Sequence, residues 1–547
     1  MNKKKNYNLI VYSLFVSLFI LGTLTFRDYG IGIDDKFHRY SGLYWLNYLL
    51  SFTNFDGLQE VVKLKLLETS DHTLPSIDGW KFYGIFFDVP AAILELIFKL
   101  DNPKDYYELR HYLNFLFYFV GCIYFYKILD LRFDRFISFF GTCFFILSPR
   151  IYGDGFYNMK DIVFLTFFVI SYYYCFKCFI NFNIKNLILF AIFSAISIET
   201  RILGLSIPLS FLSFYLFTVL AKPSEIKILY KTFAYLFFTL IFVVLFWPYL
   251  WSAPIENFLV VIKSSQNFIL SAYVFFNGEY FNNDYLPYSY VPLWILMTTP
   301  VLHILMFFIG TTYGLKRLYF RLINIEKNQL SYDLWRGVKE KYDLFILLNF
   351  LVFFLLIILL NIRLFTAWKH LYFLNFYLVY IAVLGLNIIY IWSKKLKKKI
   401  IFSISLIFIS LFIVFEMIKY HPYQGLYFNT FVPKNFKNKF EIDYLALSAR
   451  HFFDKIFELE KNDNKIHIAN ASWTPLIRTL DIYSETEKQK IELVGQNYGA
   501  AKYIYSNNIS EVDKRHNNKY DIPKGFIKLY EYKVEDLLLY TVYKRKL

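Results

Sequence analysis

Apolar runs of close to 20 residues recur along most of this chain, from Tyr12 to Ile418. Each run is long enough to cross a hydrocarbon core about 30 Å thick as a helix. The 547 residues are 57% hydrophobic and only 19% charged, whereas a soluble domain usually carries about 25% charged residues. So many long apolar runs exclude a string of soluble domains. The sequence therefore predicts an all-α polytopic membrane protein.

About eleven membrane spans are expected. They lie at residues 9–26, 111–128, 136–149, 162–180, 184–199, 203–220, 232–250, 292–315, 344–361, 371–392 and 400–418. The segment 84–100 is apolar too, but it contains Asp88, Pro90 and Glu95. We expect this segment to form a helix that lies at the membrane interface.

The positions of the basic residues predict the orientation. A formal net charge of +16 in a soluble protein would suggest nucleic acid as a partner. Here the basic residues gather in short loops, most strongly at 394–399, and all the clusters fall on one side when the N-terminus is cytoplasmic. The predicted partner is the membrane lipid, with no nucleic acid.

Two parts are predicted on this basis. Residues 1–420 form the membrane module, in which 27–110 is a long first extracytoplasmic loop, and residues 421–547 form a small extracytoplasmic α/β domain. In that domain, a helix is expected at 444–459. Runs rich in Ile, Tyr and Val predict strands at 465–469, 502–505, 526–532 and 537–543.

Paired acids and a lysine mark the first loop as a candidate site. Asp34 and Asp35 follow the first span by a few residues, and a carboxylate there suits a general base toward a sugar hydroxyl. The alternative is a solvated acidic turn. Lys81 precedes the interfacial segment and suits a lipid phosphate; the alternative is an anchor for lipid headgroups.

Further charged residues lie where apolar runs end on the same predicted side. Arg150 and Lys160 would hold a phosphate leaving group, and Asp161 would orient Lys160 or share the base role with Asp34. The alternative is helix capping and snorkelling. Lys369 and His370 begin the tenth span and add two further candidate ligands for the phosphate of a donor.

One histidine and the cysteines raise the question of metals. His421 would ligate a divalent metal with a loop carboxylate such as Asp78, although a histidine beside proline is more often structural. Cys175 and Cys178 form a CxxC inside an apolar run with no second pair, so a redox or metal role for them is not favoured.

Several short strings, taken in order, resemble the GT-C glycosyltransferases. Within that superfamily the chain looks like the bacterial relatives of dolichyl-phosphate-mannose:protein mannosyltransferases and of the lipid A aminoarabinose transferase. The strings lie at 33–38 (IDDKFH), 148–161, 247–251, 278–280, 286–288, 368–372 and 421–424. Asp35 stands where the family commonly has Glu, and Met159 where it usually has Pro.

The resemblance implies a lipid-facing cavity and a polyprenyl-phosphate sugar donor. It implies transfer of a hexosyl or pentosyl unit outside the bacterial cytoplasmic membrane to a hydroxyl acceptor on a lipid, glycan or protein. It places the base role on Asp34 and phosphate binding on Lys81.

Two other classes of function predict different sequence features. A transporter or lipid flippase predicts charged residues near mid-span and an internal repeat, and the sequence shows neither. A non-catalytic assembly protein would not need the acidic and basic clusters. The favoured hypothesis is an inverting glycosyltransferase in which Asp34 activates the acceptor and Lys81, Arg150, Lys160 or Lys369 stabilises the departing phosphate.

Overall fold

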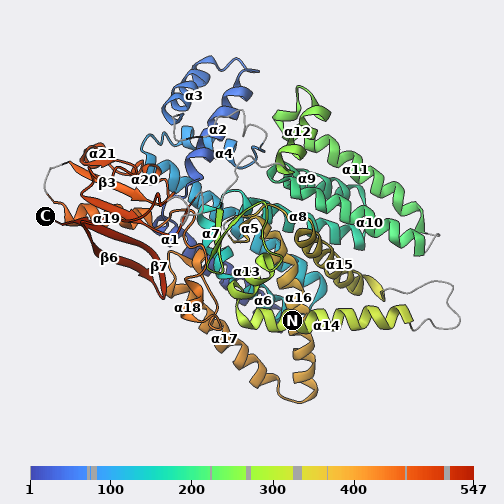
Figure 1. The fold of residues 1–547 in the computed structure, drawn as a ribbon. Coiled ribbons are helices and arrows are strands. Elements are labelled where there is room, and N and C mark those ends of the chain that lie inside the picture. The colour runs from blue at the N-terminus through green and yellow to red at the C-terminus, as the bar shows by residue number, and fades with distance from the viewer. Residues whose placement is uncertain are drawn as a thin grey trace.

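Helices occupy the first 420 residues, and a small sheet lies at one end of the helical body (Figure 1). The structure is a computed structural model, and it describes residues 2–70, 74, 83–221, 225–266, 273–323, 335–365, 367–461, 465–510 and 518–546. All eleven predicted spans fall on helices in it. These helices are α1 (Asn2–Thr25), α5 (Pro103–Arg132), α6 (Arg135–Ile146), α8 (Asp161–Ile180), α9 (Ile184–Thr200), α10 (Ser206–Ala221), α11 (Lys227–Phe246), the pair α13 (Tyr290–Thr298) and α14 (Val301–Ile323), α15 (Gly337–Leu359), α16 (Phe373–Lys395) and α17 (Lys399–Lys419).

Eight helices in the described part of the chain are long and apolar enough to cross a membrane. The number becomes nine if α6 and α7 (Pro149–Tyr157), which meet at a bend of 61°, form one span. The chain is therefore an integral membrane protein with a small sheet domain. The eight are fewer than the eleven spans expected, because α9 has only 17 residues and the predicted spans at 136–149 and 292–315 are each interrupted.

Prolines cause both interruptions. Thr299 is extended, and the residue before a proline is pushed away from the helical region. Pro300 then precedes α14, so the predicted span at 292–315 becomes two helices. Pro149 begins α7 in the same way, at the first helical position, where its missing N–H costs no hydrogen bond.

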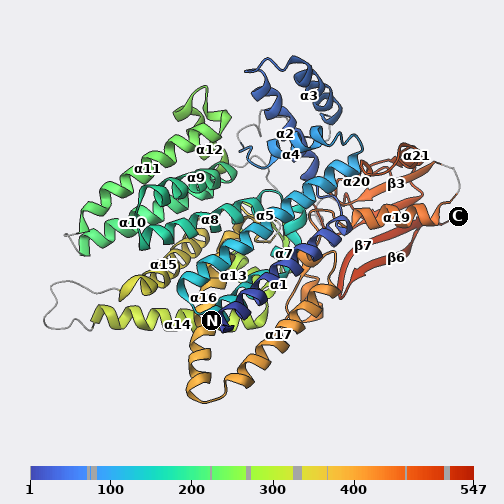
Figure 2. The ribbon, with the colours of Figure 1, turned by 180° about the vertical axis from the view of Figure 1, so that it is seen from behind.

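Helices α8 and α16 form the centre of the membrane part, since most of their residues are buried. Gly310 of α14 lies against Gly385 of α16, and a Cβ at either position would stand 2.0 Å from a backbone oxygen of the other helix. Small residues let two membrane helices approach this closely. Helix α1 runs beside α5 (Figure 2).

The first loop folds into three helices, α2 (Asp35–Leu50), α3 (Asp56–Thr69) and α4 (Asp88–Ile97). Helix α4 is the one expected at the membrane interface. It is fastened to α2 by a buried ion pair in which Arg39 Nη2 lies 2.7 Å from Glu95 Oε1. Arg110 of α5 lies 3.6 Å from the other oxygen of Glu95. These buried charges fix the loop that begins with the paired acids.

The C-terminal sheet has five strands in the order β4-β3-β5-β7-β6. Strand β3 (Ile466–Ala471) is parallel to β4 (Ile491–Leu493) and β5 (Tyr503–Ser506), while β7 (Leu537–Arg545) is antiparallel to β5 and β6 (Phe526–Val534). The four predicted strands are present, and β4 was not predicted. Outside this sheet, β1 (Tyr273–Phe276) and β2 (Glu279–Asn282) form a hairpin.

The helix predicted at 444–459 begins later, as α19 (Ala449–Leu459). Asp443 and Ala446 both have positive φ, which a helix excludes. The Asp443 carboxylate instead accepts hydrogen bonds from the backbone N–H groups of Leu447 and Ser448, both at 2.9 Å. The segment 443–448 is thereby held as a tight turn in front of α19.

This turn clamps the segment that carries the paired acids. The Ile33 N–H donates to the Leu445 carbonyl at 3.1 Å, and Arg478 donates back to the Ile33 carbonyl. Lys36 pairs with Asp481 at 3.2 Å. Residues more than 400 positions apart thus hold each other, and the C-terminal domain fixes the start of the first loop.

We predict that Gly30→Ala loosens this clamp. A Cβ at Gly30 would stand 2.1 Å from the Leu447 carbonyl oxygen, so the two backbones must separate. Overpacking of this kind typically costs about 1–3 kcal/mol. Thermal unfolding of the purified protein in detergent should show a lower midpoint. Gly57→Ala is the control, because nothing lies within 4 Å of its Cβ position. Equal midpoints for the two variants would contradict the prediction.

Candidate active site

Asp34 and Lys369 form the centre of the candidate site. Asp34 is the residue before α2, but its side chain makes no capping hydrogen bond. Its Oδ2 lies 3.5 Å from Lys369 Nζ in η6 (Lys369–Leu371), between α15 and α16. Lys369 is buried, whereas about half of the Asp34 side chain, 52%, is accessible. A partly open carboxylate therefore lies beside a buried ammonium.

The charges around Asp34 keep it ionised. Partial burial acts to raise the pKa of its carboxyl, but Lys369, His38 and Arg478 together outweigh that effect and hold the pKa below its ordinary value. An ionised carboxylate accepts a hydrogen bond from a hydroxyl. It becomes a stronger proton acceptor when its ammonium partner turns to another anion.

Asp35 is placed differently from its neighbour. It is fully buried, and one carboxylate oxygen accepts from the Gly32 N–H at 3.1 Å and contacts His111 Nε2 at 2.9 Å. These contacts tie the beginning of α2 to α5. Asp35 is thus enclosed between α2 and α5, whereas Asp34 is the member of the pair whose carboxylate is accessible.

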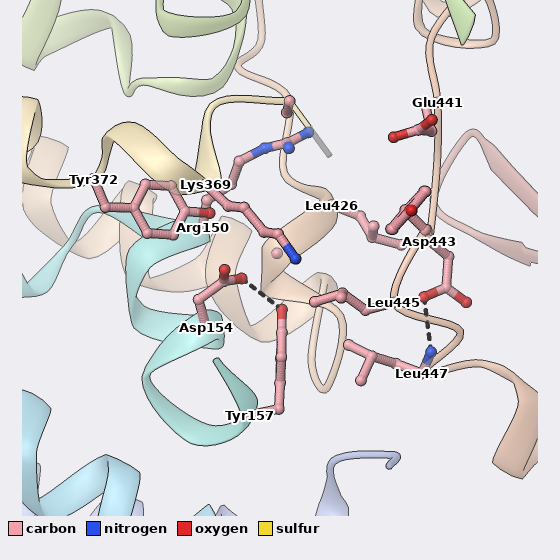
Figure 3. A pocket seen from close by; sticks show the side chains of 13 residues that line it. Arg150, Asp154, Tyr157, Lys369, Tyr372, Leu426, Glu441, Asp443, Leu445 and Leu447 are labelled. Carbon is pink, nitrogen blue, oxygen red and sulfur yellow. Dashed lines mark hydrogen bonds between the residues drawn. The ribbon is translucent and has the colours of Figure 1, made fainter. Parts of the chain in front are cut away.

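A small cavity of about 40 Å³ lies beside Lys369. Figure 3 shows the Lys369 ammonium pointing into it, between Asp154 and Tyr157 of α7 and the turn at 443–447. Asp154 accepts from the Tyr157 hydroxyl at 2.8 Å. Arg150 lines the cavity too. Helix α7 and the segment 367–372 line this cavity together with the turn before α19.

Arg150 makes no ion pair with a carboxylate of the described residues. Its Nε donates to the Tyr427 carbonyl at 3.1 Å, and its guanidinium lies over the rings of Trp294 and Phe428. Aromatic rings and a carbonyl thus position the charge. Arg150 and Lys369 are the two cations of the cavity, which the carboxylates of Asp154, Glu441 and Asp443 also line.

A second group of charges lies at the same end of the helices. Asp161, at the start of α8, pairs with Arg201 and accepts from Asn158 at 3.1 Å. Lys160 lies over the ring of Tyr83, and burial together with the charge of Arg201 lowers the pKa of its ammonium well below the ordinary value. The sequence analysis expects Asp161 to orient Lys160 or to share the base role with Asp34. In the structure, the ion-pair partner of Asp161 is Arg201.

His370 lies among these cations. Burial, followed by the charges of Arg201, Lys369 and Lys160, lowers the pKa of its imidazole well below the ordinary value. His370 is therefore neutral near pH 7 and can donate only one hydrogen bond to a phosphate. Lys160, Arg201 and Lys369 are therefore all electrostatic neighbours of His370.

The remaining predicted site residues are Lys81, Asp78 and His421. Lys81 and Asp78 lie outside the described residues, so their roles stay predictions. His421 Nε2 contacts Asp28 at 2.9 Å, and its Nδ1 contacts Gln424 at 3.1 Å. In the described part of the chain, no group of three or more His, Cys, Asp or Glu side chains is arranged to hold a metal ion. A divalent metal remains an untested prediction.

Two residues of this region were not singled out from the sequence. Arg201 lies between the spans predicted at 184–199 and 203–220, and Asp443 lies just before the helix predicted at 444–459. A charge at the junction of two apolar runs on the side of Asp34 was the available signal for Arg201. No sequence signal indicated that the turn at 443–447 would reach the cavity.

Comparisons with known proteins bear on the fold. No protein-family model matches the sequence, and no match is found among curated proteins. The oligosaccharyltransferase of Archaeoglobus fulgidus in its apo form is similar in structure, with 10% identity, a TM-score of 0.45 and coverage of 96% of this chain and 74% of that one. ArnT from Cupriavidus metallidurans bound to undecaprenyl phosphate has 9% identity, a TM-score of 0.42 and coverage of 98% of both chains.

We predict that Lys369→Met raises the pKa of Asp34. Lys369 is the strongest of the charges that lower this pKa, and without it the effect of burial is less opposed. The pH dependence of carbodiimide labelling at Asp34, followed by mass spectrometry, would measure the change. The midpoint should move to higher pH than in the wild type. Lys434→Met, which removes an exposed surface lysine, is the control. A midpoint that stays in place in Lys369→Met would show that the ammonium does not act on Asp34.

Proposed function

We propose that the protein is a glycosyltransferase that moves a sugar from a polyprenyl-phosphate carrier to a hydroxyl acceptor on the extracytoplasmic side of the membrane, with inversion at the anomeric carbon. The observation that carries the proposal is the contact between the accessible Asp34 carboxylate and the buried Lys369 ammonium, beside a cavity that Arg150 lines. A base and a phosphate site have to adjoin in this reaction, because the attacked carbon is bonded to the phosphate oxygen.

The reaction steps follow from these contacts. Lys369 and Arg150 bind the phosphate of the donor, and Lys160 with Arg201 adds positive charge nearby. The acceptor hydroxyl donates to Asp34 and attacks the anomeric carbon while the carbon–phosphate oxygen bond breaks. The phosphate keeps the electron pair, and the cations stabilise its added charge. When Lys369 turns toward the phosphate, Asp34 loses its partner and becomes a better proton acceptor.

The architecture supports a lipid-linked donor. The site lies where membrane helices α7, α8 and α16 end or begin, so a polyprenyl tail can stay in the bilayer while its phosphate reaches Lys369. The orientation predicted from the basic loops supports a position of this end outside the cytoplasm. Neither the sugar nor the chemical class of the acceptor is assigned by these contacts.

The alternative is a transporter or lipid flippase. Such proteins usually bind substrate near the bilayer midplane. The ion pairs of the described membrane helices lie near helix ends instead, as in Arg132–Asp343 and Arg201–Asp161. These two pairs lie at opposite ends of the membrane helices and neither lies near mid-span, where a transporter would bind its substrate.

The test is transfer by purified protein in detergent, supplied with undecaprenyl-phosphate sugars and a cell-envelope lipid extract. Asp34→Asn should lower transfer by about 10²–10⁴-fold, the usual contribution of a general base, with unchanged thermal stability. Asp35→Asn is the matched comparison, and it should lower the unfolding midpoint because Asp35 is buried against His111. Transfer by Asp34→Asn within a few-fold of wild type would refute the base role, and no turnover of any donor by folded wild type would refute the function.

A further inference from the structure

A second cavity, of about 500 Å³, lies where α8 ends and α9 begins. Its walls are the last turns of α8, the connection 181–183 and the first turns of α9. Helix α8 begins at Asp161 and has 20 residues, so its two ends are about 30 Å apart. This cavity is therefore about one membrane thickness away from the candidate active site, and the proposed function makes no use of it.

Hydrogen bonds fix the connection that closes this cavity on one side. The Asn183 side chain accepts from the Asn186 N–H at 2.9 Å and caps the start of α9. The Asn186 side chain donates to the Asn181 carbonyl at 2.8 Å. Lys231 of α11 donates to the Phe182 carbonyl at 3.2 Å. Because these contacts are made without a ligand, a ligand would meet a cavity that is already formed.

The walls carry positive charge and no carboxylate. Lys177 and Lys185 line the cavity, and none of the residues that line it is Asp or Glu. Neither lysine makes an ion pair or a hydrogen bond with its side chain within the described part of the chain. Lys127 of α5 lies alongside, with its ammonium 4.1 Å from the ring centre of Tyr124 and 5.9 Å from that of Tyr173. The cavity therefore suits an anion.

Aromatic rings continue the cavity toward the middle of the membrane. Tyr173 and Tyr174 line it one turn before Lys177. Helix α8 packs against both α5 and α9 (Figure 2), and the two rings contact these neighbours: Tyr173 lies 5.4 Å from Tyr124, and Tyr174 stacks on Phe193 at 5.5 Å. All four rings are only partly buried. A ligand with apolar chains would thus find a surface for them below the cations.

We propose that this cavity binds the headgroup of an anionic glycerophospholipid, in the leaflet opposite to the candidate active site. Basic pockets between membrane helices suit such headgroups, and the basic loops predict this end to be cytoplasmic. The phosphate contacts Lys177 and Lys185, and the glycerol hydroxyls contact the asparagine amides. Ile180 and Ile184, which are 52% and 66% exposed, lie at the rim and favour a ligand that carries acyl chains over a soluble phosphate ester.

The test measures binding and needs no turnover. The full-length protein in detergent is titrated with phosphatidylglycerol, and bound lipid is counted by native mass spectrometry. Phosphatidylcholine with the same chains is the neutral comparison, and glycerol 3-phosphate is the soluble competitor. Phosphatidylglycerol should bind more tightly than phosphatidylcholine, and glycerol 3-phosphate should displace it poorly. Equal binding of the two lipids overturns the inference. Binding of glycerol 3-phosphate as tight as that of the lipid overturns it in favour of a soluble phosphate ester.

Variants place the binding in this cavity. Lys177→Gln combined with Lys185→Gln should weaken phosphatidylglycerol binding by about 10–30-fold, because each lysine attracts the anionic headgroup. Leu189→Trp, which fills the cavity without a change of charge, should weaken it as well. The matched control is Lys395→Gln combined with Lys398→Gln, which removes two exposed lysines of the strongest basic cluster and should bind as the wild type does.

The unfolding midpoint without added lipid shows that each variant is folded. Equal weakening by the two lysine pairs would show attraction to the basic surface as a whole, and wild-type binding by the cavity pair would show that the lipid lies elsewhere. Either result overturns the inference. Both leave the proposed function standing, since that is judged by sugar transfer at the other end of the helices.

Discussion

The clamp between the first loop and the C-terminal domain is the constraint on which the rest of the site depends. Asp34 follows a short extended segment that no membrane helix encloses. Its position comes from Ile33, whose backbone N–H donates to the Leu445 carbonyl and whose carbonyl accepts from the Arg478 side chain. Without these contacts the carboxylate would have no fixed place beside Lys369. The C-terminal domain is therefore part of the site, and its Arg478 is among the charges that lower the pKa of Asp34.

Charge balance explains why so many ionisable groups gather at one end of the helices. A buried ammonium such as Lys369 is costly unless an anion lies near it. In the structure Asp34 is that anion. Under the proposed function the phosphate of the donor takes this place, so that one cation serves both states and donor binding changes the basicity of Asp34. Arg201 and Asp161 form a similar pair alongside.

The sequence predicted the membrane class, the positions of the helices and four of the five strands, because hydrophobic length and alternation are local properties. It also pointed to Asp34, Arg150, Lys160 and Lys369, since charges at the ends of apolar runs have few structural uses. It did not separate Asp34 from Asp35, because the direction of two adjacent side chains depends on a turn at Gly32 and on His111, 76 residues away. The span predicted at 292–315 runs through Pro300, because the apolar run continues through it, whereas the structure divides this span between α13 and α14.

The role of the turn at 443–447 could not be predicted either. Its positive φ angles and its contacts with Ile33 depend on tertiary packing, and Tyr444 to Leu459 reads as one helix by its pattern. Residues far apart in sequence meet here because the first and last extracytoplasmic segments fold together. Such contacts have no signature in a single sequence.

The most direct test of the account is a double-mutant cycle on Asp34 and Lys369, with kcat/KM measured for the wild type, Asp34→Asn, Lys369→Met and the double variant. Groups that act as one unit show strongly non-additive losses. The account predicts that the double variant is about as active as the poorer single variant. Losses that multiply, as for two independent sites, would contradict the claim that one ammonium serves the base and the phosphate in turn.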